Sequence, residues 1–210
     1  MIGLGGRLTT VEERSELAAE VRRIVEAAGK PLTERSQSAA ADRATAGDVE
    51  RKAVRRELVT AADRAVELAV VTALQALRPE DGILAEEGVV TPTGAISRAD
   101  AEFLWILDPI DGTTNFVHGV PFFAVAIGLY RGAEPVLAVV HAPALGRTYH
   151  AVVGGGAFRN DQRLEVSPTP ELADGLLATG FSYIRDQPGT DDNLARLGRA
   201  LPLCRDLRRL

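Results

Sequence analysis

Two aspartates around a proline carry the strongest chemical signal in this sequence. Asp108 and Asp111 stand three residues apart, and the carbonyl of Ile110 lies between them. Carboxylate and carbonyl oxygens are the ligands that Mg²⁺ prefers, especially where a substrate phosphate completes its coordination. The backbone amides from Gly112 to Thr114 would face an anion if they open a helical turn. The pattern therefore indicates a combined metal and phosphate site.

The alternative interpretation is an ordinary surface turn, because Asp, Pro and Gly are common turn residues. The flanking sequence favours the metal site. An apolar run at Phe103–Leu107 predicts a buried strand that ends at Leu107, and a second apolar run at Phe122–Ile127 leads away from the turn. Carboxylates held between two core strands cost free energy unless something neutralises them.

The composition predicts a folded domain without the charge of a nucleic-acid binder. Hydrophobic residues make up 46% of the 210 positions, and the formal net charge is −5. Nucleic-acid binding normally uses a basic surface. No apolar run is long enough to span a membrane, and residues 1–10 lack the apolar region of a secretory signal. Cys204 is the single cysteine, so no internal disulfide can form, and we expect a cytoplasmic location.

Hydrophobic periodicity predicts a helix pair followed by an antiparallel sheet. The Thr10-Val-Glu-Glu13 capping box opens a helix that we expect to end at Gly29, and a connector is expected from Lys30 to Lys52. A second helix is expected over residues 60–77, ended by Pro79. Strands are expected at residues 83–86, 103–107, 122–131, 135–142, 147–153, 156–159 and 164–167, the later ones as an antiparallel meander.

The pattern changes after Pro170 to strand (176–181), helix (191–201) and strand (203–207), which is typical of an α/β layer. We therefore predict an α+β fold, a layered α/β sandwich, in two parts. Residues 1–170 would form the helix pair and the antiparallel sheet that carries the metal site. Residues 171–210 would begin a C-terminal α/β subdomain that is incomplete.

Three blocks of sequence resemble the inositol monophosphatase family of Mg²⁺-dependent phosphomonoesterases. Trp105–Phe116 is similar to the family signature Trp-x-x-Asp-Pro-Ile-Asp-Gly-Thr-x-Asn-Phe. Leu58–Asp63 resembles the family's Leu-Val-Thr-x-x-Asp. Ile83–Glu87 resembles its Gly-Glu-Glu block, with Ala85 in place of the glycine.

The resemblance implies a set of metal ligands. Glu86 and Asp108 would bind a first Mg²⁺ together with the backbone carbonyl of Ile110. Asp108 and Asp111 would hold a second Mg²⁺, which relatives complete with an aspartate of a later Trp-Asp-x-Ala-Ala-Gly signature. Nothing in the 210 residues matches that later block, so we expect a truncated gene product or a recorded fragment.

The resemblance also implies residues that act on the phosphate and on the attacking water. Gly112 and Thr113 would present backbone amides to the phosphate. Thr113, paired with Asp63, would orient the water and help to deprotonate it, and Glu87 would act on a water or on a third, weaker ion. Lys52 falls where relatives have a lysine near the phosphate, although the residues after it depart from the family's Ser-Ser-Pro pattern.

Structural roles compete with these assignments. Glu86 and Glu87 read alone would be a solvated acidic pair. Asp63 stands in the first turn of the second expected helix, where the helix dipole favours an acid. Thr113 could serve only as a helix cap.

The leading functional hypothesis is Mg²⁺-dependent hydrolysis of a small phosphate monoester by a metal-activated water. Inositol 1-phosphate or a similar polyol or sugar phosphate is the expected substrate, with histidinol phosphate as the alternative. Two other hypotheses are a truncated, inactive family member that binds metal without turnover, and a pure metal- or phosphate-binding module. The resemblance also implies a homodimer.

Overall fold

In the computed structural model of the protein, the described residues are 8–41, 49–51, 58–88, 101–182, 187 and 189–209, with side chains described outside 35–41, 49–51 and 58–59. The expected connector lies partly outside this set, and so does Lys52. The chain divides into two compact units, one of residues 1–49 and 59–164 and one of residues 50–58 and 165–210.

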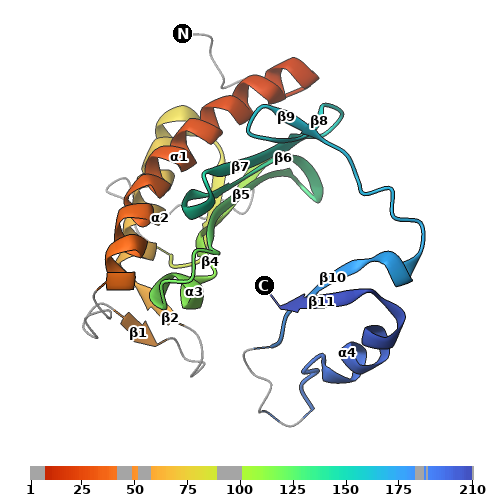
Figure 1. Ribbon diagram of the computed structural model, residues 1–210. Coiled ribbons are helices and arrows are strands. Elements are labelled where there is room, and N and C mark those ends of the chain that lie inside the picture. The colour runs from red at the N-terminus through yellow and green to blue at the C-terminus, as the bar shows by residue number, and fades with distance from the viewer. Residues whose placement is uncertain are drawn as a thin grey trace. The chain divides into compact units, whose positions relative to one another are not determined.

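The first unit is a layer of two helices on a seven-stranded sheet (Figure 1). The helices are α1 (Val11–Ala41) and α2 (Ala61–Leu77). The sheet has the order β3-β4-β5-β6-β7-β8-β9. Its strands are β3 (Gly82–Ala85), β4 (Phe103–Asp111), β5 (Ala124–Arg131), β6 (Glu134–Ala142), β7 (Arg147–Val152), β8 (Gly156–Arg159) and β9 (Gln162–Leu164).

Strands β4 to β9 pair antiparallel in sequence order, which confirms the predicted meander. Strand β3 instead pairs parallel to β4. A short helix α3 (Thr113–Val117) follows β4, and a 3₁₀ turn η1 (Pro143–Leu145) joins β6 to β7. Before α2, β1 (Val49–Arg51) and β2 (Leu58–Thr60) form a separate two-stranded sheet.

The second unit contains a strand–helix–strand unit, as the sequence predicts after Pro170. Strand β10 (Leu176–Thr179) pairs parallel with β11 (Asp206–Arg209), and α4 (Leu194–Ala200) lies between them in sequence. Two 3₁₀ turns complete it, η2 (Leu172–Asp174) and η3 (Leu201–Leu203). The predicted class, a helix pair on an antiparallel sheet followed by an α/β layer, is confirmed.

The core lies between the helix pair and the sheet. Along β4, the side chains of Phe103, Trp105 and Leu107 are buried and alternate with the more exposed Leu104 and Ile106, as the pleat of a strand requires. The helices contribute apolar residues at helical spacing, which form one face. Fully buried residues of this core include Leu17, Val21 and Val25 of α1, Val70 and Leu74 of α2, and Trp105, Val125, Leu129 and Val139 of the sheet.

Helix α1 does not end at Gly29, so the sequence-based expectation is wrong there. The helix continues through Lys30 and Pro31 to Ala41. Leu32 is 1% exposed and packs in the core, which holds the chain helical beyond the glycine. A Cβ added at Gly29 would lie 2.6 Å from Cδ2 of His141. The glycine therefore permits a close approach of helix and sheet, and does not act as a helix stop.

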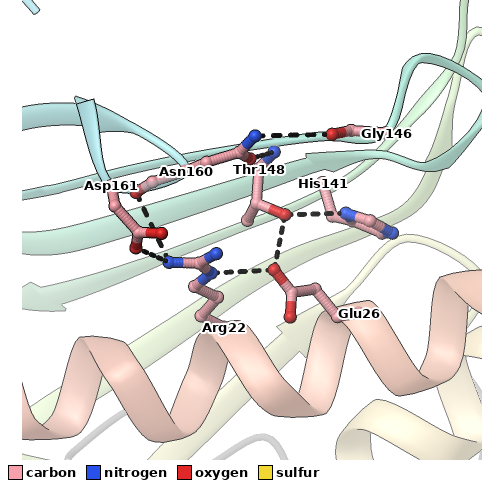
Figure 2. A network of polar contacts seen from close by, with 7 residues as sticks. All are labelled: Arg22, Glu26, His141, Gly146, Thr148, Asn160 and Asp161. Atoms are coloured by element: carbon pink, nitrogen blue, oxygen red, sulfur yellow. Dashed lines mark hydrogen bonds and ion pairs between the residues drawn. The ribbon is translucent and has the colours of Figure 1, made fainter.

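A polar network fastens α1 to the β6–β9 side of the sheet (Figure 2). Nε of Arg22 donates to Oε1 of Glu26 at 2.8 Å, and the Thr148 hydroxyl donates to the same oxygen at 2.7 Å. Nδ1 of His141 lies 2.9 Å from the Thr148 hydroxyl oxygen. Because the Thr148 hydrogen points to Glu26, we assign the hydrogen between His141 and Thr148 to the imidazole.

Among the described residues, no helix has both the length and the apolar character needed to cross a membrane.

Candidate metal and phosphate site

The two signature aspartates lie at the end of β4, which runs beyond the expected stop at Leu107. Asp108 pairs with Ala126 and Asp111 pairs with Ala124, so β4 has one extra residue between these two pairs. This is a β-bulge, the kind of irregularity that admits a proline into a sheet and redirects side chains. Pro109 lies inside it. The bulge explains why a strand continues through a sequence that reads as a turn.

Asp108 is a part-buried carboxyl in a negatively charged setting. Burial raises its pKa to about 7, and the negative charges of Glu86 and Asp111 and a hydrogen bond to Glu86 add to the increase. Within the described part of the chain, its Oδ1 is buried without a hydrogen-bond partner. The raised pKa means that Asp108 keeps its proton to a higher pH, and that proton can form the hydrogen bond to Glu86. Glu86 and Asp108 therefore lie together, with Asp111 close enough to affect Asp108.

These groups have the chemistry of a hard-cation site but not the geometry of a finished one. Among the described residues, no set of three Asp, Glu, His or Cys side chains is already gathered closely enough to hold a metal ion. The buried Oδ1 of Asp108, unpartnered among the described residues, nevertheless offers a lone pair that a divalent cation would accept, and the nearby carboxyls of Glu86 and Asp111 add oxygen ligands. A cation bound there would lower the pKa of Asp108 again, because its positive charge favours ionised carboxylates.

Asp63 and Thr113, fifty residues apart, lie in hydrogen-bond contact. The Thr113 hydroxyl lies 3.2 Å from Oδ1 of Asp63 and 2.9 Å from the carbonyl oxygen of Ile110, and its one hydrogen is shared between these acceptors. The other oxygen of Asp63, Oδ2, accepts from the amide and the hydroxyl of Thr60 at 2.8 and 2.6 Å. The same carboxylate thus closes the capping box of α2 and bonds Thr113.

The turn after Asp111 is shaped by glycine and by an asparagine. Gly112 has φ of +86°, and a Cβ there would lie 3.1 Å from the carbonyl oxygen of Phe122. Nδ2 of Asn115 donates to that same carbonyl at 2.8 Å. Phe116 packs edge-on against Phe123, with ring centroids 5.1 Å apart. The signature residues after Asp111 therefore fix the start of α3 against the chain that leads into β5.

The first part of the signature is anchored at the other end of β4. Nε1 of the fully buried Trp105 donates to Oδ2 of Asp81 at 2.9 Å. The guanidinium of Arg78 forms a buried ion pair with Asp81, with Nε at 2.5 Å from Oδ2. Arg78 also lies over the ring of Phe103, 5.0 Å from its centroid. Through this hydrogen bond, Trp105 ties β4 to Asp81 and has a structural role.

Glu67 of α2 is a buried charged residue that sequence reasoning missed. It is 0% exposed, and its Oε2 accepts from the backbone amide of Glu87 at 2.8 Å. Glu67 follows Asp63 by four residues, so the two share one face of α2. The sequence did offer a signal for Glu67. It is an acid beside the apolar Val66 and Val70, on the face of α2 that the helical pattern predicts to be buried. Glu87 is itself half-buried, and Glu86 is exposed.

Comparison with known proteins yields one family and a consistent set of relatives. A profile described as "Inositol monophosphatase family" matches residues 4–207. The chain is 38% identical over 152 residues to "Inositol monophosphatase 2" of Solanum lycopersicum, covering 72% of this chain and 57% of the relative. It is 40% identical over 137 residues to "Fructose-1,6-bisphosphatase/inositol-1-monophosphatase" of Thermotoga maritima, covering 65% and 50%.

A solved structure extends the likeness to the fold. The extragenic suppressor protein suhB from Bartonella henselae superposes with a TM-score of 0.79 at 31% identity, over 92% of this chain and 70% of that one. The chain spans about half the length of the two curated relatives, 57% and 50%.

Proposed function

Because this chain belongs to the inositol monophosphatase family, we propose that it supplies the Mg²⁺-dependent hydrolytic site for a small phosphate monoester. Inositol 1-phosphate or a similar polyol or sugar phosphate is the proposed substrate. The observation that carries the proposal is the part-buried carboxyl of Asp108. Its Oδ1 has no hydrogen-bond partner among the described residues, and burial and the nearby charges of Glu86 and Asp111 raise its pKa. Such a site is electrostatically unfavourable unless it holds protons or cations.

The proposed metal ligands are the carboxylates of Glu86, Asp108 and Asp111 and the carbonyl of Ile110. When bound there, Mg²⁺ would acidify a coordinated water and offset the charge on the leaving oxygen. Ile110 is 1% exposed, and its carbonyl oxygen already accepts from Thr113. The Thr113 hydroxyl would therefore connect the metal side of the site to Asp63.

Asp63 and Thr113 are proposed to handle the proton of the attacking water. Asp63 is 1% exposed, so its carboxylate has little contact with bulk water. When the Thr113 hydroxyl donates to Asp63, its lone pairs can accept a hydrogen from a water, which orients that water and draws its proton toward the carboxylate. The roles of Glu87 in holding a water and of Lys52 near the phosphate remain proposals, and Lys52 lies outside the described residues.

The phosphate itself would be received by the turn after Asp111. The first amides of a helix have no partner within the helix, and those of Gly112 and Thr113 start α3. The left-handed Gly112 and the Asn115 contact to the Phe122 carbonyl hold this turn in shape. Pre-organised donors of this kind stabilise the charge that spreads over a phosphoryl group in reaction.

Phosphate release from inositol 1-phosphate, measured with and without Mg²⁺, tests the proposal, with Asp108→Asn as the control. Release that needs Mg²⁺ and exceeds the control would support it. Release equal to the control in both conditions would contradict it. A Mg²⁺-dependent rise in melting temperature without release would favour the binding module or the inactive relative. Histidinol phosphate in a parallel reaction tests the alternative substrate.

A homodimer and a cytoplasmic location also belong to the proposal. Multi-angle light scattering of the purified chain would test the first, and fractionation of the source cells would test the second.

A further inference from the structure

Glu67 is a carboxylate that the proposed chemistry leaves without a role, although it is fully buried in the middle of α2. Burying a charged carboxylate costs several kcal/mol, and an apolar residue of similar size at such a position is often as stable or more stable. The Oε2 of Glu67 accepts a hydrogen bond from the amide of Glu87, in the loop that carries Glu86.

The loop after β3 is held from two directions at adjacent residues. The amide of Glu86 donates to the carbonyl oxygen of Leu107 at 3.2 Å, which ties the loop to β4 one residue before Asp108. The amide of Glu87 donates to the Glu67 carboxylate at 2.8 Å, which ties the loop to α2. The two fixed amides flank the Cα of Glu86. They restrict its backbone and so the direction in which its side chain leaves the chain.

Glu67, which holds the loop from α2, lies on the same helix as Asp63 of the proposed site. Asp63 and Glu67 lie one turn apart on the same face of the helix. Through Oδ1, Asp63 contacts Thr113, and through Oε2, Glu67 contacts Glu87. One rigid helix thus sets the distance between the pair proposed to act on water and the loop that brings Glu86 to Asp108.

We propose that Glu67 is a positioning residue for the metal site, which aims the Glu86 side chain at Asp108 by holding the Glu87 amide. The inference rests on the proposed function, because it assumes that Glu86 and Asp108 bind the cation. Residues that orient metal ligands through hydrogen bonds typically change metal affinity by about 10- to 100-fold when they are replaced.

The test uses Mg²⁺ as the probe and isothermal titration calorimetry of the whole 210-residue chain as the measurement. Glu67→Leu removes the acceptor at nearly constant volume, and it should weaken Mg²⁺ binding by about 10- to 100-fold. Glu67→Gln keeps an oxygen acceptor, although a weaker one than a carboxylate, and should lose less affinity. Val70→Ala, a cavity variant one turn further along the same helix, should lower the melting temperature without changing Mg²⁺ affinity.

Hydrogen exchange at the Glu87 amide gives a readout that needs neither metal nor turnover. With EDTA present, the amide should exchange faster in Glu67→Leu and, to a smaller extent, in Glu67→Gln, but not in Val70→Ala. If Glu67→Leu does not fold, Glu67→Gln carries both measurements. In a Glu86→Gln background, replacing Glu67 should have little further effect on Mg²⁺ affinity, because its influence passes through Glu86.

Mg²⁺ affinity within twofold of the unaltered protein in both Glu67 variants, with faster exchange at Glu87, would overturn the inference and leave the proposed function intact. Absence of Mg²⁺ binding by the unaltered protein would instead contradict the proposed function.

Discussion

Oδ1 of Asp63 and the hydroxyl oxygen of Thr113 lie 3.2 Å apart, although fifty residues separate them. The other oxygen of Asp63 closes the capping box with Thr60. The sequence offered a helix-terminal role and a chemical role for Asp63 as alternatives. The structure shows that one carboxylate closes the capping box of α2 and also accepts a hydrogen bond from Thr113. The capping box at the start of α2 therefore fixes the position of the Asp63 oxygen that accepts from Thr113.

Replacing Thr113 separates its hydroxyl from its shape. Thr113→Ser keeps the hydroxyl, and Thr113→Val keeps the volume without it. We expect Thr113→Val to lower kcat for inositol 1-phosphate by about 10²- to 10⁴-fold, because the link between water and Asp63 is lost. Thr113→Ser should retain most of the activity. Equal losses in the two variants would show that the hydroxyl is not what matters, and steady-state phosphate release measures both.

Replacing Asp63 tests the carboxylate itself. Asp63→Asn should lower kcat by about 10²- to 10⁴-fold, because the amide cannot take a proton. The matched control is Thr10→Ala, which breaks the capping box that Thr10 forms with Glu13 at the start of α1. The control should cost about 0.5–2 kcal/mol of stability and leave kcat unchanged. Phosphate release and urea denaturation of both variants give the comparison.

The raised pKa of Asp108 predicts that Asp108→Asn is more stable than the unaltered protein at high pH without metal, and less stable with Mg²⁺. Its pKa in the folded protein is raised from 3.8 to about 7, so the folded state holds the proton more tightly than the unfolded chain does. The stability due to this proton is complete below pH 3.8 and is lost as the pH rises to about 7 and above. Asp108→Asn cannot ionise. At pH 8 in EDTA it should therefore be more stable than the unaltered protein, by roughly 1–2 kcal/mol once solvent screening of a part-buried group is discounted.

Saturating Mg²⁺ should reverse that order, because a ligand that binds only the folded state adds to its stability. Urea denaturation at pH 5 and pH 8, in EDTA and in Mg²⁺, measures all four conditions. A variant that is less stable than the unaltered protein in EDTA at pH 8 would contradict the prediction.

The signature segment was predictable because its information is local. Spacing of acids, a left-handed glycine and flanking apolar strands all lie within about twenty residues of Asp108. The bulge that carries β4 past Leu107 was not predictable, because Asp-Pro-x-Asp-Gly favours a turn locally and only pairing with β5 keeps the chain extended. Glu67 was missed for a similar reason. Its partner, the Glu87 amide, lies twenty residues away and carries no side-chain signal.

Burial lowers the pKa of His141 and of His150, which stacks on Phe158. The charges near both histidines are those of Arg22, which lowers the two pKa values, and of Glu26, which raises them, and Asp161 also raises that of His150. In the folded protein the two histidines therefore stay neutral to a lower pH than they do in the unfolded chain. Their contribution to the free energy of unfolding is complete above pH 6.5 and is lost as the pH falls through the lowered pKa values.

Denaturation between pH 8 and pH 5 should therefore show a loss of stability, measured in the Asp108→Asn background so that Asp108 does not contribute. Replacing both histidines by glutamine should flatten the dependence. An unchanged slope in the double replacement would assign the loss to other groups.

The contact between Gly29 and His141 gives a sharper test. The effect of Gly29→Ala on stability should change sign when His141 is removed. In a helix interior, alanine is ordinarily more stable than glycine by about 0.5–1 kcal/mol. At Gly29 the added Cβ would lie 2.6 Å from Cδ2 of His141, and that ring is held by the Thr148 hydroxyl, itself bonded to Glu26 (Figure 2). We expect Gly29→Ala to destabilise the protein by about 1–3 kcal/mol, the usual cost of overpacking.

In a His141→Ala background, the same Gly29→Ala replacement should stabilise the protein by about 0.5–1 kcal/mol, because the clash is gone and only the helical preference remains. Urea denaturation of the four proteins measures the coupling directly. If Gly29→Ala had the same effect in both backgrounds, the glycine would be serving the helix alone. A change of sign would show that contact with the sheet selects the glycine, and would explain why a residue typical of helix ends lies in the interior of α1.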